Sequence, residues 1–332
     1  MMLKKPKILV VGSLNMDAIA STKRVPGSGE TVIGMKFHTA PGGKGINQAI
    51  QCARLGAEVT MVGKVGNDDF GRTLLGVASS SGVDVSHVLT DDSEATGVAV
   101  ILLEVKDEGT QNRITVCPGA NHTVTIDEIA WIRDVISQYD MLILQFELPM
   151  SIVETAAQWA HDAGVPVMIN PAPAAPMSDR LLQCATYLSP NEHEAAILAD
   201  HPIRVEDGVN TDDIEAVVGK FQASGVDNLI ITMGGNGSVV AGKDGIHYTP
   251  CVKMPYVVDP TAAGDSFVAA FCTVLTAGLP QNLALDFASH AAAITVSRMG
   301  AINSLPTLAE VQALLTERQY RGFDPAVLNV LM

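Results

Sequence analysis

KILVVGSL, residues Lys7–Leu14, is a continuous apolar run of the length of a β-strand. Similar runs recur along the chain, at Glu58–Gly63, Asp140–Gln145, Pro166–Asn170, Ala185–Ser189 and Asn228–Thr232. Unbroken apolar runs, as opposed to alternating ones, are typical of parallel strands that are covered on both faces. The sequence therefore predicts a sheet buried in the middle of the molecule.

Helical patterns of apolar residues lie between these runs. They are predicted at about Ile46–Leu55, Phe70–Ser80, Thr125–Ser137, Ser151–Ala163 and Asp212–Ala223, with two long helices near Ala263–Ala277 and Asn282–Ser297. This alternation indicates an α/β fold with a central, mostly parallel sheet flanked by helices. With 332 residues, of which 47% are hydrophobic and 17% charged, the chain suits one large unit. We expect a single domain over residues 1–332.

Three segments depart from the alternation. Asp17–Ala40 and Gly97–Pro118 are predicted to be extended, with polar and β-branched residues between turn glycines. They lie far apart in sequence, and we expect them to pair as a small separate sheet that forms a lid over the mouth of the main sheet. Residues from about Tyr320 to the end are predicted to be a loosely held tail.

The composition excludes several classes of protein. The formal net charge is −15 at pH 7 and no block of Lys or Arg occurs, which argues against nucleic-acid binding. No apolar run approaches the ~20 residues of a membrane span. The 5 cysteines are scattered and form no CxxC pair, so neither a disulfide framework nor a structural zinc site is expected. These features predict a cytoplasmic protein.

The stretch Asp259–Phe267, DPTAAGDSF, leads directly into an apolar helix. Small residues at Ala262, Ala263 and Gly264 let backbone N–H groups point into one space at the helix start, where the helix dipole also favours anions. A carboxylate at Asp265 would repel a phosphate there unless it has a task. We predict that it orients a substrate hydroxyl and accepts its proton during phosphoryl transfer; the alternative is an ordinary first-turn helix charge.

A second glycine-rich stretch, Pro41–Ala49, reads PGGKGINQA. It nearly matches the GxGxxG fingerprint of dinucleotide-binding folds, but Gln48 stands at the third glycine position. It also follows the predicted lid segment instead of the first strand, which argues against an NAD site. We expect Lys44 and Asn47 to hydrogen-bond a polar ligand, with a plain glycine turn before a helix as the alternative.

The stretch Gly12–Asp17, GSLNMD, stands at the carboxyl end of the first predicted strand, where ligands of open α/β sheets bind. Asn15 and Asp17 are two residues apart and face the same way if the chain stays extended. Their amide and carboxylate suit a pair of sugar hydroxyls. Glu147, just after another predicted strand, adds a further carboxylate. Each of these residues alone could equally be a cap or turn residue.

Two further stretches suit a nucleotide. Asn191–Glu194, NEHE, follows a predicted strand and begins a helix, so its carboxylate either completes a capping box or organises Mg²⁺ through water. Thr232–Gly237, TMGGNG, is a loop after a strand and is suited to wrapping phosphates. No GxxxxGK[ST], GxSxG or HExxH motif occurs, and the set of motifs of protein kinases is missing.

These residues resemble the ribokinase-like carbohydrate kinases, a family that includes adenosine kinase and fructokinases. The likeness runs from about Lys7 to Leu315 and includes the PGGKGINQA and DPTAAGDSF segments. Within the family the chain is most similar to the ribokinases, on GSLNMD, GGKGINQA, PGAN at Pro118–Asn121, LQFELP around Glu147 and NPAPA at Asn170–Ala174.

The resemblance implies a ribokinase-like three-layer fold with a small β-sheet lid. It further implies a homodimer in which the lids of two subunits clasp, and transfer of the γ-phosphate of ATP to the 5-hydroxyl of D-ribose with Mg²⁺. The catalytic base falls on Asp265, and the anion-hole amides fall on Ala262, Ala263 and Gly264. Sugar contacts fall on Asn15, Asp17, Gly43, Lys44, Asn47, Glu147 and Asp265. Nucleotide and metal positions fall on Asn191, Glu194, Thr232, Gly234, Gly237 and Gly264.

The resemblance also implies an activating K⁺ beside the anion hole, held mostly by carbonyl oxygens. The matching positions are Asp259, Thr261, Thr295, Arg298, Gly300 and Ser304. Pro260 stands where the family more usually has Thr, and proline fixes its own φ and biases the preceding residue toward extended conformations. We expect K⁺ activation to survive this change, because the ligands are largely backbone oxygens.

Three alternatives remain open at this point. The first is a sibling sugar kinase acting on 2-deoxyribose or on another pentose or ketohexose. Asp17, placed to bind vicinal hydroxyls, favours ribose, since a site built to hydrogen-bond a hydroxyl rejects the analogue that lacks it. The second is a sugar-binding sensor without turnover, which should have lost Asp265 or the adjacent glycine. The third is a Rossmann oxidoreductase, which the sequence GSLNMD after the first strand disfavours.

Overall fold

The computed structural model describes residues 3–106, 109–205, 208–243 and 245–332. Its largest element is a nine-stranded sheet. The strands are β1 (Lys7–Val11), β4 (Glu58–Gly66), β5 (Val83–Asp91), β8 (Met141–Leu144), β9 (Val167–Ile169), β10 (Tyr187–Leu188), β11 (Leu229–Thr232), β12 (Ser238–Gly242) and β13 (Gly245–Thr249). They lie in the order β13-β12-β11-β10-β9-β8-β1-β4-β5.

The sheet is parallel from β5 to β11, and β12 and β13 join the β11 edge as antiparallel strands. All six runs predicted as strands are strands of this sheet; five have somewhat shorter bounds, and β4 extends to Gly66. The predicted mostly parallel sheet is therefore confirmed.

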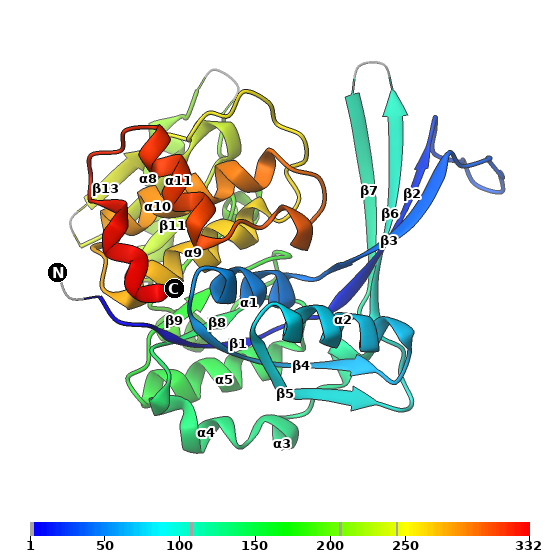
Figure 1. Ribbon diagram of the computed structural model, residues 1–332, viewed down its shortest axis with the longest axis horizontal. Coiled ribbons are helices and arrows are strands. Elements are labelled where there is room, and N and C mark those ends of the chain that lie inside the picture. Colours follow the sequence, from blue (N-terminus) through cyan, green and yellow to red (C-terminus); the bar gives the residue numbers. More distant parts are fainter. Residues whose placement is uncertain (1–2, 107–108, 206–207, 244) are drawn as a thin grey trace.

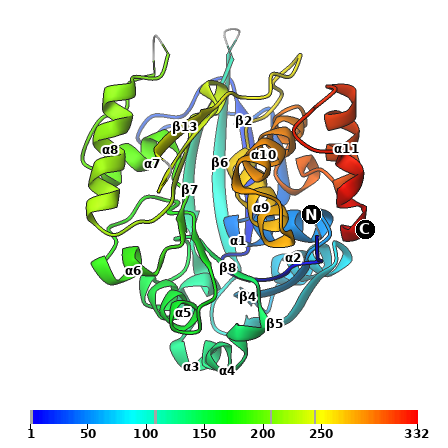
Figure 2. The same cartoon turned by 90° about the vertical axis from the view of Figure 1, so that its left-hand side faces the viewer.

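Helices cover both faces of the sheet, as Figures 1 and 2 show from two directions. On one face lie α1 (Lys44–Arg54), α2 (Asp69–Ser80), α9 (Ala263–Ala277), α10 (Gln281–Val296) and α11 (Leu308–Glu317). On the other face lie α3 (Ile126–Ile129), α4 (Ile132–Val135), α5 (Met150–Asp162), α6 (Asp179–Cys184), α7 (Glu192–Leu198) and α8 (Thr211–Ala223).

Strand β1 shows why the apolar runs are continuous. Ile8 and Val10 belong to the core cluster under α1 and α9, whereas Leu9 and Val11 belong to the cluster under α5. Successive side chains of a strand point to opposite faces, so a strand covered on both sides must be apolar at every position. All four side chains are completely buried.

Two expectations from the sequence are wrong. The helix predicted over Thr125–Ser137 is broken into α3, α4 and a 3-10 turn at Ile136–Gln138, although Ile129, Ile132 and Ile136 keep the helical spacing and are buried. The end of the chain is not a loosely held tail. A 3-10 helix, η5 (Pro325–Leu331), packs there against the body through Leu328 and Leu331, which are buried in the core beside α1 and α11.

The two predicted lid segments form a second, four-stranded sheet that stands apart from the main sheet at the right of Figure 1. It consists of β2 (Asn15–Thr22), β3 (Lys36–Gly42), β6 (Gly97–Lys106) and β7 (Gly109–Cys117), in the order β3-β2-β6-β7. The parallel pairing of β2 with β6 joins the two segments. Residues 23–35 are turns and irregular chain, not strand, and 107–108 lie outside the described residues.

From the sequence, neither a disulfide framework nor a membrane-spanning segment was expected. All 5 cysteines are free, and Cys52, Cys184 and Cys272 are buried. Among the helices of the described ranges, none is both long and apolar enough to cross a bilayer.

Candidate active site

Asp265 occupies the first turn of α9, at the carboxyl ends of the parallel strands. The residue is 7% exposed, and its carboxylate receives two hydrogen bonds from α1. Asn47 Nδ2 donates to Oδ2 at 2.9 Å, and Gln48 Nε2 donates to Oδ1 at 3.0 Å. Burial raises the pKa of Asp265, while the Lys44 ammonium and the two amide donors oppose that rise. The carboxylate is thus held rigidly, and its affinity for a proton exceeds that of an exposed Asp.

Gln48 is a site residue that the sequence analysis missed. Besides Asp265, its Nε2 donates to Asn170 Oδ1 at 3.1 Å, and its Oε1 accepts from Gln145 Nε2 at 2.6 Å. Asn170 Nδ2 in turn donates to the Ser189 carbonyl at 2.7 Å. This buried chain of amides determines which way the Gln48 amide points, so that N–H faces the carboxylate. The only signal in the sequence was the glutamine at the third glycine position of PGGKGINQA.

The predicted sugar-binding residues meet around Glu147, which follows β8. Its Oε2 accepts from Asn15 Nδ2 at 3.3 Å, from the Lys44 backbone N–H at 3.2 Å and from the Ser13 hydroxyl. Gly43, at the start of α1, has φ 104°, a conformation that favours glycine, and a Cβ there would lie 2.7 Å from Asn15 N. The glycine therefore lets the loop before α1 contact the backbone where β2 begins.

Asp17 is the second carboxylate of this group. Gly42 lies directly against it, since a Cβ on Gly42 would be 2.6 Å from Asp17 Oδ2. Burial raises the pKa of Asp17 to about 7, and the negative charges of Glu147 and Asp265 add to the rise. Three carboxylates therefore converge here, and a ligand with several hydroxyl donors would stabilise them.

Lys44 lines a pocket of about 210 Å³ together with Asp265. Burial disfavours its charge, yet the carboxylates of Asp265, Glu147 and Glu194 outweigh that effect and raise its pKa. The pocket brings together residues from six predicted stretches, namely Lys44, Asn170, Ala172, Ser189, Asn191, Glu194, Thr232, Pro260, Ala262, Gly264, Asp265 and Val268. Lys44 was predicted as a sugar contact; its backbone N–H donates to Glu147, and the residue also lines this pocket.

A second pocket, of about 470 Å³, adjoins the first and is more apolar. Thr232, Pro260 and Gly264 line both pockets. The larger pocket is formed by the loop after β11, the irregular stretch before α9, and the facing sides of α9 and α10. Its walls are Thr232, Gly234, Gly235, Gly237, Ser238, Cys251, Val252, Lys253, Met254, Val257, Pro260, Ala263, Gly264, Phe267, Ser289, Ala292, Ala293 and Val296. A flat heterocycle with attached phosphates fits such a pair of pockets.

The start of α9 provides amides between the two pockets. Ala262 is its N-cap and adopts a left-handed conformation with φ 60°, unusual for a residue with a Cβ. Of the predicted anion-hole amides, the Ala263 N–H donates to the Pro260 carbonyl at 3.2 Å. Within the described residues, the N–H groups of Ala262 and Gly264 donate to no backbone carbonyl outside a helix. These two amides are free to bind an anionic oxygen.

Asn191 and Glu194 form a capping box at the start of α7. The Asn191 side chain accepts from the Glu194 N–H at 2.8 Å, and Glu194 Oε2 accepts from the Asn191 N–H at 2.9 Å. Both line the smaller pocket. Burial raises the pKa of Glu194, and the Asn191 N–H opposes the rise. The capping alternative is thus observed, and Glu194 also lines the smaller pocket.

Of the residues predicted to hold a monovalent cation, Asp259 hydrogen-bonds two, Thr261 and Gly300. Its Oδ1 accepts from the Thr261 N–H at 3.0 Å and from Thr261 Oγ1 at 2.6 Å, and its Oδ2 accepts from the Gly300 N–H at 2.9 Å. Burial opposes ionisation of Asp259, but these three donors outweigh it and lower the pKa. The Arg298 side chain turns away to Glu310, at 2.6 Å, so only its backbone could serve a cation. Thr295 and Ser304 lie on either side of Arg298 in the sequence, and both are buried. Their hydroxyl groups donate hydrogen bonds to other groups of the protein.

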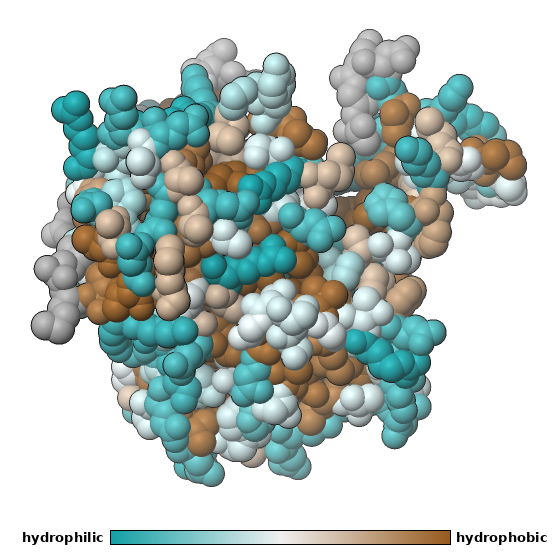
Figure 3. Space-filling model, in the orientation of Figure 1, coloured by the Kyte–Doolittle hydropathy of each residue, from teal (hydrophilic) through white to brown (hydrophobic). Residues whose placement is uncertain are grey.

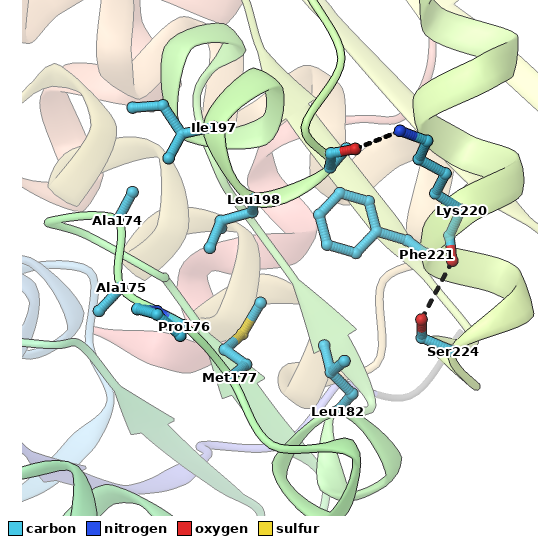
Figure 4. Close-up of a pocket in the computed structure, with 11 residues that line it drawn as sticks. Ala174, Ala175, Pro176, Met177, Leu182, Ile197, Leu198, Lys220, Phe221 and Ser224 are labelled. Atoms are coloured by element: carbon cyan, nitrogen blue, oxygen red, sulfur yellow. Dashed lines mark hydrogen bonds between the residues drawn. The ribbon is translucent and has the colours of Figure 1, made fainter.

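Another pocket, of about 390 Å³, lies away from Asp265 and is shown in Figure 4. Its wall is mostly apolar and includes Met177, Leu198 and Phe221. The one charged side chain in it, Lys220, donates through Nζ to the Ala199 carbonyl at 2.5 Å. Within the described residues this pocket offers no carboxylate or anion-binding helix start, so the chemistry belongs to the two pockets around Asp265.

Comparison with known proteins agrees with this geometry. The sequence profile of the pfkB family carbohydrate kinases matches residues 5–308. The chain belongs to this family. The Schizosaccharomyces pombe ribokinase is 40% identical over 314 residues, covering 92% of this chain and 96% of its own. The Bacillus subtilis ribokinase is 36% identical over 316 residues, covering 93% and 99%.

The solved structures of pfkB kinases include one of Arabidopsis thaliana ribokinase in complex with ribose and ATP. It matches this chain with a TM-score of 0.84 at 32% identity, covering 94% of this chain and 99% of that one. The predicted ribokinase-like fold, with its main sheet between helices and its separate small sheet, is confirmed. The chain is a carbohydrate kinase of the ribokinase type.

Proposed function

We propose that this protein transfers the γ-phosphoryl group of ATP to the 5-hydroxyl of D-ribose. The observation that carries the proposal is the position of Asp265 between two different environments. On one side lie the hydroxyl-binding groups of Asn15, Asp17 and Glu147. On the other lies the glycine-lined pocket of about 470 Å³, suited to a nucleotide. The relatives from Schizosaccharomyces pombe and Bacillus subtilis are named ribokinases, which supports the choice of ribose as the sugar.

The residues around Asp265 have different roles in the proposed reaction. Asp265 orients the 5-hydroxyl and takes its proton as the P–O bond to the hydroxyl oxygen forms and the bond to ADP breaks. The Ala262 and Gly264 amides and the Lys44 ammonium stabilise the negative charge on the transferred group. Glu147 and Asn15 hold the sugar, and Asn47 Oδ1, which has no hydrogen-bond partner among the described side chains, is left for a donor.

Mg²⁺ fits this site only through water. Glu194 lines the smaller pocket while it caps α7, so its carboxylate would hold the hydration shell of the ion. When bound, Mg²⁺ supplies charge neutralisation for the phosphates. Among the described residues no cluster of three or more His, Cys, Asp or Glu side chains forms a direct cage.

We also propose activation by K⁺ at Asp259 and the carbonyls of Thr261, Thr295, Arg298 and Gly300, with Ser304 beside them. Asp259 Oδ2 accepts a hydrogen bond from the Gly300 N–H, and the Val258 N–H donates to the Val296 carbonyl. These two bonds join the stretch before Pro260 to the end of α10 and the residues that follow it. We expect kcat to be several-fold higher in K⁺ than in Na⁺ buffer of equal ionic strength. Equal rates in the two salts would contradict this proposal.

The raised pKa of Asp17 predicts how sugar binding depends on pH. The ionised carboxylate accepts sugar hydroxyls, and in the free protein it ionises only near pH 7 in place of 3.8. About a tenth of the protein is ionised at pH 6 and about nine tenths at pH 8, so KM for ribose should fall about tenfold between them. Steady-state kinetics across this range provides the measurement. Asp17→Asn should bind ribose weakly, with a KM that no longer changes with pH.

The raised pKa of Asp17 also makes the stability of the folded protein depend on pH. The folded protein binds a proton at Asp17 between about pH 4 and pH 7, where the unfolded chain does not. Stability therefore falls as the pH rises through this window, because the ionised carboxylate is buried. Asp17→Asn should remove this part of the pH dependence of thermal unfolding, and an unchanged dependence would argue against the assignment.

The lid supports the proposal of a homodimer. Large apolar side chains are exposed on it, including Phe37, Val100, Ile114 and Val116, and brown patches are visible on the projecting sheet in Figure 3. Among the described residues, the edge strands β3 and β7 each pair with another strand of this sheet on one side only. Such surfaces are typical of interfaces. Light scattering should give twice the mass of one chain, and Phe37→Glu should shift it toward one; a monomeric wild-type protein would contradict the proposal.

The activity itself is tested by ADP release with ATP, Mg²⁺ and K⁺ over ribose, 2-deoxyribose, arabinose, xylulose, fructose, tagatose and adenosine. We expect ribose to give the highest kcat/KM. A different preferred sugar would support a sibling kinase, and ribose binding without turnover would support a sensor.

The scattered free cysteines support a site of action in the cytoplasm.

A further inference from the structure

The lid joins the body through a small region in which one side chain touches two of the connections. The chain passes between body and lid at Leu14–Asn15, Gly42–Gly43, Thr96–Gly97 and Cys117–Pro118. Asn121 lies beside them in a 3-10 helix, η1 (Gly119–Thr123), and is 1% exposed. This residue ends the PGAN stretch, to which the mechanism above gives no role.

The Asn121 side-chain amide forms hydrogen bonds at two of these connections. Its Oδ1 accepts from the Leu14 N–H at 3.0 Å. Its Nδ2 donates to the Leu14 carbonyl at 3.1 Å and to the Pro118 carbonyl at 3.0 Å. It therefore bonds both the chain entering β2 and the chain leaving β7. A side chain that serves both would transmit a displacement of one strand to the other.

The two N–H groups of Asn121 Nδ2 are shared among three acceptors, of which Asn15 Oδ1 is the nearest at 2.9 Å. Because its carbonyl oxygen is bound in this way, the Asn15 amide keeps its Nδ2 toward Glu147 Oε2, at 3.3 Å. Reversing the Asn15 amide would place its NH₂ group against the NH₂ group of Asn121. The second N–H of Asn15 Nδ2 is thus available to the sugar in one orientation.

The first residue of β6 confirms how closely these groups are packed. A Cβ on Gly97 would lie 2.2 Å from Asn15 Oδ1 and 2.3 Å from Asn121 Nδ2. Any side chain at this position would separate the two amides or displace β6. The lid strand therefore begins in direct contact with the pair.

We propose that Asn121 is a positioning residue that orients the Asn15 amide for the sugar and links this contact to the base of the lid. The inference rests on the proposed function, because it assigns Asn15 to sugar binding. It predicts that losing Asn121 weakens ribose binding specifically, whereas a purely structural residue would change stability alone.

The test is a double-mutant cycle read out as KM. Asn121→Ala should raise KM for ribose about tenfold, the effect of leaving one buried polar group unpaired. KM for ATP should change less than about twofold. In the Asn15→Ala background the same substitution should raise KM for ribose less than about threefold, since the two residues act through one contact.

A matched control comes from the same 3-10 helix. Thr123 Oγ1 donates to Asp91 Oδ2 at 2.6 Å, and among the described residues its side chain has no hydrogen bond to Asn15. Thr123→Val should lower the melting temperature as Asn121→Ala does but leave KM for ribose unchanged. Equal KM effects of the two substitutions would overturn the inference, as would an undiminished effect of Asn121→Ala in the Asn15→Ala background.

A second variant tests the amide pair if Asn121→Ala does not fold. Gly97→Ala presses a methyl group between the two amides and should also raise KM for ribose about tenfold. Gly76→Ala, where a Cβ meets no atom within 4 Å, is its control. A normal KM in Gly97→Ala would overturn the inference. Wild-type protein without ribose turnover would instead reject the proposed function, so the two failures are distinguishable.

Discussion

Asp265→Asn should lower kcat by about 10³-fold while leaving ATP binding intact, because a carboxamide cannot accept the hydroxyl proton. The substitution is nearly isosteric, and Asp265 is contacted by α1 donors on both oxygens. One of those donors will lose its acceptor, so a modest fall in stability is expected as well. Single-turnover transfer of the phosphoryl group measures the chemical step, and calorimetry measures ATP affinity.

The control for this substitution is Asp69→Asn. Asp69 is also in the first turn of a helix, α2, but its side chain is 94% exposed. It should behave as wild type in both measurements. A kcat of Asp265→Asn within about tenfold of wild type would remove Asp265 from the role of base and restore the alternative of a simple helix charge.

Lys44→Met should lower kcat by about 10²-fold, since it removes the one ammonium that lines the smaller pocket together with Asp265 and Gly264. It should also move the acid limb of the kcat profile to higher pH. The Lys44 charge lowers the pKa of Asp265, so its loss leaves that carboxylate protonated up to a higher pH. Steady-state rates across the pH range, with saturating ribose and ATP, provide both readouts.

Lys5→Met is the matched control, because Lys5 is exposed near the start of the chain. It should change neither the rate nor the pH profile. If Lys44→Met lowered kcat without moving the acid limb, Lys44 would act on the transferred group alone. If it changed only KM for ribose, the assignment of its side chain to the phosphoryl pocket would be wrong.

The sequence predicted the parallel sheet, the lid strands and the position of Asp265, because each is indicated by a pattern of residues that are adjacent in the sequence. Continuous apolar runs reflect burial on both faces, as Ile8 and Leu9 show by packing into opposite cores. The helix over Ala263–Ala277 has the predicted bounds, since its small first residues and its apolar body are local features. The interrupted helix after Thr125 was mispredicted because its buried isoleucines keep helical spacing across the break.

What the sequence alone determined is therefore the order of the elements and the residues at strand and helix ends that carry the chemistry. Only the tertiary structure decided which of them touch. Gln48 and Asp265, 217 residues apart, are bonded because α1 packs against α9, and Asn121 reaches Asn15 across 106 residues of chain. The burial of Leu328 and Leu331 likewise depends on a surface formed by other elements. Hydrogen bonds and burial between distant segments arise only from packing, which no local pattern records.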